Sequence, residues 1–151
     1  KAPSVCPQAV ADQIPAALKG QGTVLKNGDS GTIDGLPVTA VAAYNTSPDK
    51  QQYHPEGRGN GYVLSFGDKN IYIAGDTEPT PEMEALTGID IAFLPMNQPY
   101  TMTPQQAADA VKAFRPKVVY PYHYRGTDTQ AFKDLVGAAA EVRLRDWYAT
   151  P

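Results

Sequence analysis

The chain has 151 residues, a formal net charge of −3 and a pI near 5.3. Hydrophobic residues make up 42% and charged residues 19%, a balance typical of a globular domain and not of a disordered or low-complexity chain. The acidic balance argues against a nucleic acid partner held by phosphate neutralisation, although it leaves room for a local phosphate pocket. No stretch approaches the roughly 20 apolar residues that cross a bilayer, so we expect no membrane partner.

The chain has one cysteine, Cys6, so no internal disulfide can form and the fold depends on packing or on metal. A lone thiol fits a reducing compartment, and we expect a cytoplasmic location, with the periplasm as the alternative. Cys6 itself is either a nucleophile or a buried residue. No histidine lies near it in the sequence, which favours the buried residue.

The first half of the chain predicts a short helix and then antiparallel strands. Apolar residues recur every four positions in residues 7–18, where Pro15 divides the predicted helix. Asn27-Gly28 and Asp34-Gly35 are dipeptides that favour tight hairpin turns. We therefore expect a meander of three strands, which are residues 23–26, 32–34 and 36–44. Residues 45–61 are polar and rich in Gly and Pro, as long functional loops often are.

The second half alternates strands and helices. Thr103 is a predicted helix cap, followed by Pro104 at the first helical position and Gln106 where a capping box places it. The predicted strands are residues 62–66, 71–74, 89–96, 117–122 and 141–144. The predicted helices are residues 79–86, 103–114 and 130–140. This alternation indicates crossover units with helices covering a sheet, and hence a mixed α/β (α+β) fold in a single domain over residues 1–151.

Three side chains form a candidate metal site. Asp76 and His123 each follow an apolar strand, and His54 lies on the long polar loop. Side chains at strand ends are held rigidly while the loops there diverge, so ligand sites gather at those ends. Nitrogen and oxygen donors suit Zn²⁺, with Mn²⁺ or Fe as alternatives. Three protein ligands leave a position for water, which the ion activates for hydrolysis.

Some of these residues have an ordinary structural alternative. Asp76 either binds metal or caps Glu78 or the helix expected near Pro79. Arg58 and Arg125 are either solvated surface charges or the partners of an anionic substrate group.

Alternation places Tyr120, Tyr122 and Tyr124 on one side of the predicted strand, if that strand continues so far. A packed aromatic stripe is favoured over a binding platform.

Two parts of the sequence match a known family. Gly61–Leu64 followed by Ile71–Glu78, with its Gly-Asp-Thr at 75–77, resembles a strand pair of the metallo-β-lactamase-fold hydrolases. The branch it resembles most is that of ascorbate-phosphate lactonase and related Zn-dependent hydrolases. Pro121–Tyr124 is similar to the late histidine motif of the same family. The resemblance covers about residues 5–137 and implies that the chain is part of a four-layered αββα sandwich.

The resemblance also implies roles for single residues. Asp76 takes the position of the residue that bridges two metal ions, and His123 that of a terminal ligand, so one or two divalent ions are expected. Many relatives have His at the position of Asn45, and whether His54 or Asn45 takes this middle position stays open. The His-x-His-x-Asp-His motif of the family is missing from the sequence. We therefore expect this chain to be the C-terminal portion of the fold, with the motif upstream.

Two functions follow from these expectations. The first is a metal-dependent hydrolase of a small ester, lactone or phosphorylated metabolite, in which Asp76 and His123 are catalytic and Asn97 and Arg125 contact the substrate. The chain by itself would then have little or no activity. The second is a non-catalytic fragment that binds a ligand or assembles, as a homo-oligomer or with the missing N-terminal segment. The content of bound metal distinguishes the two.

Overall fold

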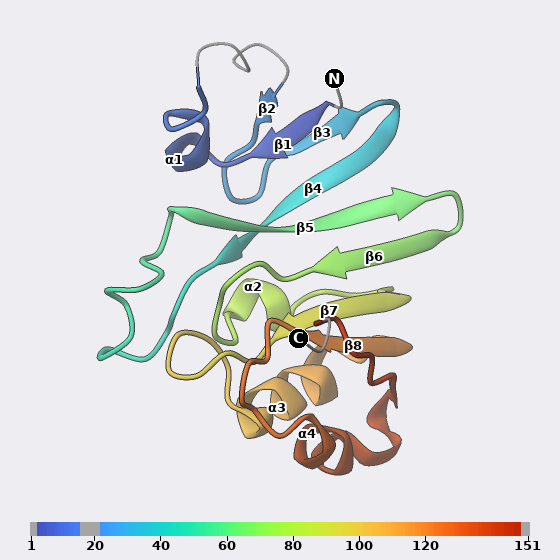
Figure 1. Cartoon of the computed structure of the whole chain (residues 1–151). Helices are drawn as coiled ribbons and strands as arrows, with labels where there is room; N and C mark the ends of the chain where they lie inside the picture. Colours follow the sequence, from blue (N-terminus) through green and yellow to red (C-terminus); the bar gives the residue numbers. More distant parts are fainter. Residues whose placement is uncertain (1–2, 16–21, 149–151) are drawn as a thin grey trace.

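A seven-stranded mixed sheet dominates the computed structural model, which describes residues 3–15 and 22–148 (Figure 1). The strands of this sheet are β3 (Ser30–Ile33), β4 (Leu36–Ala43), β5 (Gly59–Phe66), β6 (Lys69–Ile73), β7 (Ile91–Pro95), β8 (Val118–Tyr122) and β9 (Glu141–Val142). They lie side by side in chain order, antiparallel from β3 to β6 and parallel from β6 to β9. The antiparallel part is joined by turns and a loop, whereas the parallel part needs crossovers, which contain the helices.

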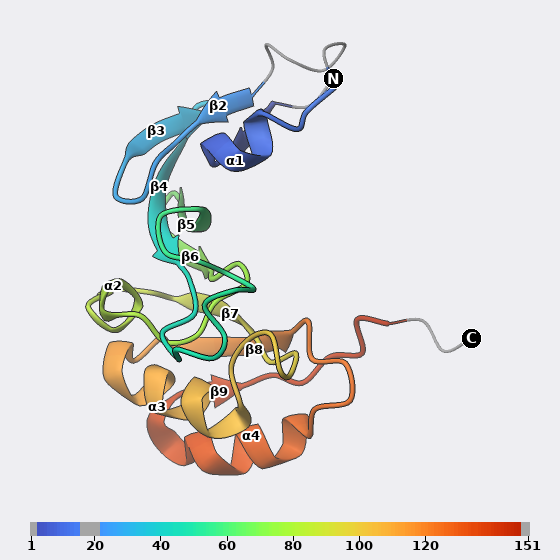
Figure 2. The ribbon, with the colours of Figure 1, turned by 90° about the vertical axis from the view of Figure 1, so that its left-hand side faces the viewer.

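The helices that follow β6 cover one face of the sheet. They are α2 (Pro81–Glu84), α3 (Pro104–Phe114), α4 (Thr129–Val136) and the short 3₁₀ helix η1 (Gly137–Ala139). Figure 2 shows α3 and α4 together on the same side of β7 and β8. The predicted capping box is confirmed: Thr103 accepts from the Gln106 backbone N–H, and the Gln106 side chain accepts from the Thr103 N–H.

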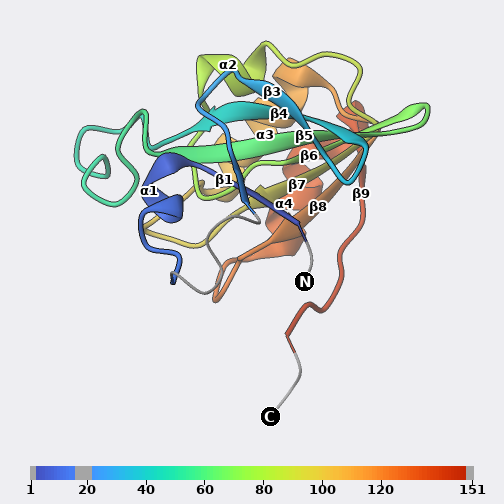
Figure 3. The same ribbon diagram turned by 90° about the horizontal axis from the view of Figure 1, so that it is seen from above.

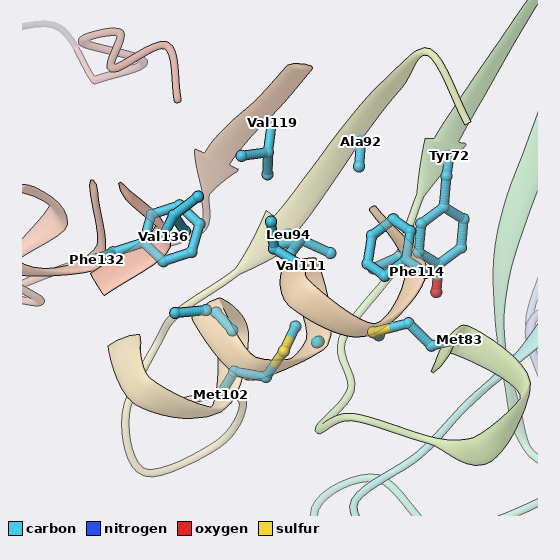
Figure 4. Packing of buried hydrophobic residues seen from close by; sticks show 14 of the residues in the cluster. Tyr72, Met83, Ala92, Leu94, Met102, Val111, Phe114, Val119, Phe132 and Val136 are labelled. Atoms are coloured by element: carbon cyan, nitrogen blue, oxygen red, sulfur yellow. The ribbon is translucent and has the colours of Figure 1, made fainter. Parts of the chain in front are cut away.

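The main core lies between the sheet and these helices. Tyr72, Ala92 and Val119 are in register on adjacent strands, and all three are fully buried. These three side chains face the helices and pack in one cluster with Phe114 of α3 and Phe132 of α4, as the close view shows (Figure 4). Strand alternation sends the next residues to the opposite face. This pairing therefore fixes which side chains of β6 to β8 face away from the helices.

That opposite face is aromatic and partly exposed. Ile73, Phe93 and Tyr120 are in register, and the rings of Phe93 and Tyr120 stack with centroids 5.2 Å apart. Trp147 packs against both rings, and its indole N–H donates to the Pro121 carbonyl at 2.8 Å. Packing is thus confirmed for Tyr120, as expected for an aromatic stripe. Tyr124 lies beyond the end of β8, so the expected alternation does not reach it.

A smaller two-stranded sheet precedes the large one. β1 (Ser4–Cys6) pairs in parallel with β2 (Gly22–Val24), and the helix α1 (Gln8–Ala11) lies between them in the chain. Leu25 joins Val38 and Ala40 in a second buried cluster, which connects this sheet to β4. Cys6 is buried in β1, in agreement with the structural alternative.

Three sequence-based predictions of secondary structure were wrong in part. The strand predicted at 23–26 belongs to the small parallel sheet and not to the meander, because its partner is the unpredicted strand β1. The helix predicted at 7–18 extends only over α1, and residues 16–18 lie outside the described residues. The helix predicted at 130–140 ends as an α-helix at Val136, because Gly137 has a φ of +55°. The other predicted elements are present with shifted ends.

Within residues 3–15 and 22–148, no helix is long and apolar enough to cross a membrane.

Candidate metal centre

Asp76 lies in a tight turn directly after β6. Gly61 of β5 allows this turn, because a Cβ there would lie 2.6 Å from the Ala74 carbonyl oxygen. Gly75 has a φ of +71°, and a Cβ on it would lie 2.7 Å from the Asn60 carbonyl oxygen. Only glycine tolerates both the close approach and the left-handed backbone. These two glycines therefore turn the chain sharply and present Asp76 at the end of the sheet.

The residue after Asp76 fixes the turn to the neighbouring strand. The Thr77 hydroxyl accepts from the Tyr44 N–H at 3.0 Å and contacts the Tyr44 carbonyl oxygen at 2.9 Å. The side chain of Asp76 does not cap the following helix, since the cap of α2 is Thr80, whose hydroxyl accepts from Met83 N–H. The alternative in which Asp76 is a helix cap is therefore wrong. Its carboxylate stays half-exposed and available.

His54 is presented by the long loop between β4 and β5, which projects beyond the sheet in Figure 3. Its Nδ1 lies 3.1 Å from the carbonyl oxygen of Tyr100, an oxygen that can only accept a hydrogen bond. The contact of this Nδ1 with the Asn45 amide nitrogen is longer, at 3.4 Å, so we assign the ring proton to the Nδ1. This assignment leaves the Nε2 with a free lone pair, the arrangement that metal-binding imidazoles require. The Asn45 Nδ2 donates to the same carbonyl oxygen at 2.8 Å, while the buried Asn45 Oδ1 has no hydrogen-bond partner among the described residues. Whether His54 or Asn45 takes the middle ligand position stays a prediction.

His123 follows β8 in a left-handed backbone conformation, with a φ of +46°. Its carbonyl oxygen accepts from the Met96 N–H at 3.2 Å, so the turn is anchored to the end of β7. The Asn97 Nδ2 lies 3.2 Å from the His123 Nε2. Non-glycine residues are uncommon in this backbone region and often mark functional sites. The strained turn directs the imidazole toward Asp76.

The two imidazoles meet at one oxygen of Asp76. The Nε2 atoms of His54 and His123 lie 3.5 Å and 3.9 Å from the Asp76 Oδ2. All three side chains are partly accessible, so an ion could reach them from solvent. The described residues contain no group of three or more His, Cys, Asp or Glu side chains already spaced as a complete metal site. The donor set and the His54 tautomer nevertheless fit a divalent ion that would draw the three groups together.

A buried carboxylate next to Asp76 ties the His54 loop to the rest of the domain. Glu78 is 0% exposed and accepts from the Ser47 N–H at 2.7 Å, the Ser47 hydroxyl at 2.9 Å and the Gln106 amide at 3.1 Å. The Lys50 Nζ lies 3.0 Å away. Burial alone would raise the pKa of Glu78, but the hydrogen bonds from Ser47, Gln106 and Lys50 outweigh it and lower the pKa to about 2. Glu78 is thus an ion at neutral pH.

Asp76 lies between two cavities. The first measures about 350 Å³, and its lining includes His54, Arg58 and Tyr53 from the long loop. The second measures about 530 Å³, and its lining combines the aromatic face with His123 and Tyr122. Both sizes are within the range of small-molecule sites. A ligand at Asp76 can therefore extend to either side.

Burial, with the Asp76 charge adding to it, raises the pKa of Tyr122. Its hydroxyl therefore stays protonated, and it donates to the Gly75 carbonyl oxygen at 3.0 Å.

The predicted substrate residues have different surroundings. Asn97 contacts His123 and so lies at the centre, whereas Arg125 is exposed in the turn before α4 and is not in the lining of either Asp76 cavity. Both substrate roles stay predictions. Sequence reasoning missed Glu78, Lys50 and Tyr100. A Glu directly after a Gly-Asp-Thr turn was a signal, but nothing local indicated its partners 28 to 31 residues away.

The fold and the site together define a class of protein. A mixed sheet with helices on one face, and a strand-end aspartate facing two histidines, is the arrangement expected of the metallo-β-lactamase fold. Residues 8–123 match the family described as the β-lactamase superfamily domain. The chain belongs to this superfamily.

Relatives and solved structures agree with the fold. A UPF0173 metal-dependent hydrolase of Pyrococcus abyssi is 34% identical over 142 residues, which are 88% of this chain and 62% of the relative. A crystal structure from Parabacteroides distasonis, described as that of a candidate metal-dependent hydrolase, is 48% identical, with a TM-score of 0.86 over 93% of this chain and 63% of its own. A metallo hydrolase of Ignicoccus hospitalis is 28% identical, with a TM-score of 0.75 over 95% of this chain and 64% of its own. The chain thus spans slightly under two thirds of each, and the predicted fold class is confirmed.

Proposed function

We propose that this chain supplies part of the active site of a divalent-metal-dependent hydrolase, in which Asp76, His54 and His123 bind the ion. The observation that carries this proposal is the approach of two imidazole Nε2 atoms to one Asp76 oxygen, at 3.5 and 3.9 Å. The relatives from Pyrococcus and Parabacteroides, both described as metal-dependent hydrolases, support the same reaction type. Zn²⁺ is the proposed ion, because two imidazoles and a carboxylate are among its preferred donors.

When bound, the ion would polarise the scissile group and activate water. The protein residues would orient the reactants. His54 is held in one tautomer by the Tyr100 carbonyl, and His123 is fixed in its turn by Met96. Asn97, 3.2 Å from the His123 Nε2, is placed to align that ring or to donate to a substrate oxygen. The proposed substrates are small esters, lactones or phosphorylated metabolites, which the cavity volumes admit.

Metal content tests the proposal. The full chain, dialysed against trace Zn²⁺, Mn²⁺ and Fe²⁺, is expected to retain about one ion per molecule by elemental analysis, and Asp76→Asn and His123→Ala are each expected to lose most of it. Asp109→Asn, on the exposed side of α3, is the matched control and should keep the metal. Equal metal content in the Asp76 variant and the unmodified chain would contradict the proposal.

A second function rests on the aromatic face of β6 to β8. Phe93, Trp147 and Tyr148 line a cavity of about 530 Å³ that is mainly apolar. This lining would suit a ligand-binding or assembly module without catalysis. A chain that binds no metal, and that binds an aromatic probe or self-associates in sedimentation experiments, would support this candidate over the hydrolase.

A further inference from the structure

Another cavity, with polar side chains in part of its lining, adjoins the one that contains Asp76 and His54. It measures about 360 Å³, and the described residues that line it include two cations, Lys26 and Arg58, and no carboxylate. The two cavities share four lining residues, Pro7, Ala9, Arg58 and Asn60. A ligand of moderate length can therefore have one end at Asp76 and the other between the two cations.

The wall that carries these cations is fixed by amide side chains. The Asn27 Nδ2 donates to the Asn60 Oδ1 at 2.7 Å and to the Gly59 carbonyl at 2.8 Å. The Asn60 Nδ2 donates in turn to the Leu25 carbonyl at 2.8 Å. These bonds join the segment before β3 to the first residues of β5. Lys26 and Arg58 each lie beside a member of this network, so the backbone positions of both are set.

The two cations have no anionic partner in the described part of the chain. No ion pair or side-chain hydrogen bond there involves the Lys26 Nζ or the Arg58 guanidinium. The remaining residues, 1–2, 16–21 and 149–151, contain no Asp or Glu. The carboxylate of Asp29 lies close to Lys26, since it accepts from the Lys26 backbone N–H at 2.9 Å, but it does not pair with the Lys26 Nζ. Two positive charges at one cavity, with no ion-pair partner among the described residues, favour an anion there. The Arg58 guanidinium can also donate hydrogen bonds to two oxygens at once, as guanidinium groups do with carboxylate and phosphate.

We propose that this cavity binds a compact anionic group, a phosphate or a carboxylate, of the substrate whose reacting part lies at Asp76. The proposal deepens the hydrolase function and rests on it for the reaction, but the binding of an anion can be measured without turnover. It makes Lys26 and Arg58 the residues that select anionic over neutral substrates. Loss of one cation is expected to weaken binding about three- to tenfold, because solvent screens a charge-assisted hydrogen bond at an exposed site.

The test is a titration of the full chain with inorganic phosphate at constant ionic strength, followed by amide NMR shifts. Saturable shifts are expected at Lys26 and Arg58, with a dissociation constant that rises about three- to tenfold in Arg58→Gln and further in the double Lys26→Gln, Arg58→Gln variant. Arg58→Lys should recover part of the affinity. Lys112→Gln removes the same charge from the exposed side of α3 and should leave phosphate binding unchanged.

Two further measurements show where the phosphate binds and which anions the cavity accepts. Phosphate held by metal at Asp76 would be lost in Asp76→Asn, an outcome that would overturn the proposal, whereas affinity retained in that variant supports a separate anion site. Acetate in place of phosphate shows whether a carboxylate suffices. Shifts that stay linear with both anions, or that are equal in Arg58→Gln and the unmodified chain, would also overturn it. The hydrolase proposal would survive that result, because metal retention by Asp76 and His123 is measured separately.

Discussion

Replacement of Glu78 by Gln is expected to destabilise the domain and loosen the His54 loop. The carboxylate is fully buried and accepts hydrogen bonds from Ser47 and Gln106, with Lys50 as its ionic partner. Glutamine has the same shape but no charge, and its NH₂ group would face donors that also need an acceptor. Removing the charge from a buried hydrogen-bonded ion leaves its partners unsatisfied, and this lowers the free energy of unfolding more than replacing all of the partners together would.

The magnitude follows from the Glu78 pKa. A value of about 2 in the folded protein against the ordinary 4.5 corresponds to about 3 kcal/mol of stability at neutral pH. Because the folded-state pKa is the lower one, this contribution is fully present above about pH 4.5 and is lost as the pH falls toward 2. The expected free energy of unfolding of the Gln variant is therefore lower by about 3 kcal/mol at pH 7, with a difference that shrinks on acidification.

Urea denaturation at pH 7 and at several values down to pH 3 measures this difference. Glu84→Gln, an exposed carboxylate in the neighbouring α2, is the control and should change the free energy of unfolding by less than about 0.5 kcal/mol. Hydrogen exchange should also show faster opening of residues 45–54 in the Glu78 variant. A variant as stable as the unmodified chain at pH 7, or a stability difference that does not depend on pH, would refute the reasoning.

Three further substitutions test the fold. Leu94→Ala, at a fully buried position of β7, should lower the free energy of unfolding by about 2–5 kcal/mol in urea denaturation, and a loss below 1 kcal/mol would place Leu94 outside the tight core. Thr103→Ala removes the cap of α3 and should cost about 1 kcal/mol by the same assay, whereas Thr103→Ser should be nearly neutral. Gly61→Ala puts a Cβ 2.6 Å from the Ala74 carbonyl oxygen, so a markedly lower melting temperature is expected, and an unchanged one would show that β5 and β6 can separate there.

The predictions that held are those that depend on residues close together in the chain. The capping box of α3 needs only Thr103, Gln106 and the backbone between them, so the sequence pattern predicted it. The hairpin at Asp34-Gly35 is equally local, since both residues have positive φ, as a tight turn requires. The apolar runs of the buried strands were evident for the same reason. The prediction for β2 failed because its partner, β1, is a distant strand that no local pattern indicated.

The sequence by itself determined that Asp76 and His123 follow apolar strands, and hence that both lie at one end of a sheet. Only the tertiary structure decided which atoms meet there. The parallel register of β6, β7 and β8 brings the His123 Nε2 to 3.9 Å from the Asp76 Oδ2, although the two residues are 47 positions apart. The contact with the Tyr100 carbonyl favours the tautomer of His54 that carries the proton on Nδ1. The tertiary structure also decided that the buried Glu78 carboxylate binds Ser47 and Lys50 and so fixes the loop that carries His54. These contacts depend on burial and on strand order, which are properties of the packed chain and have no signature in any short segment of it.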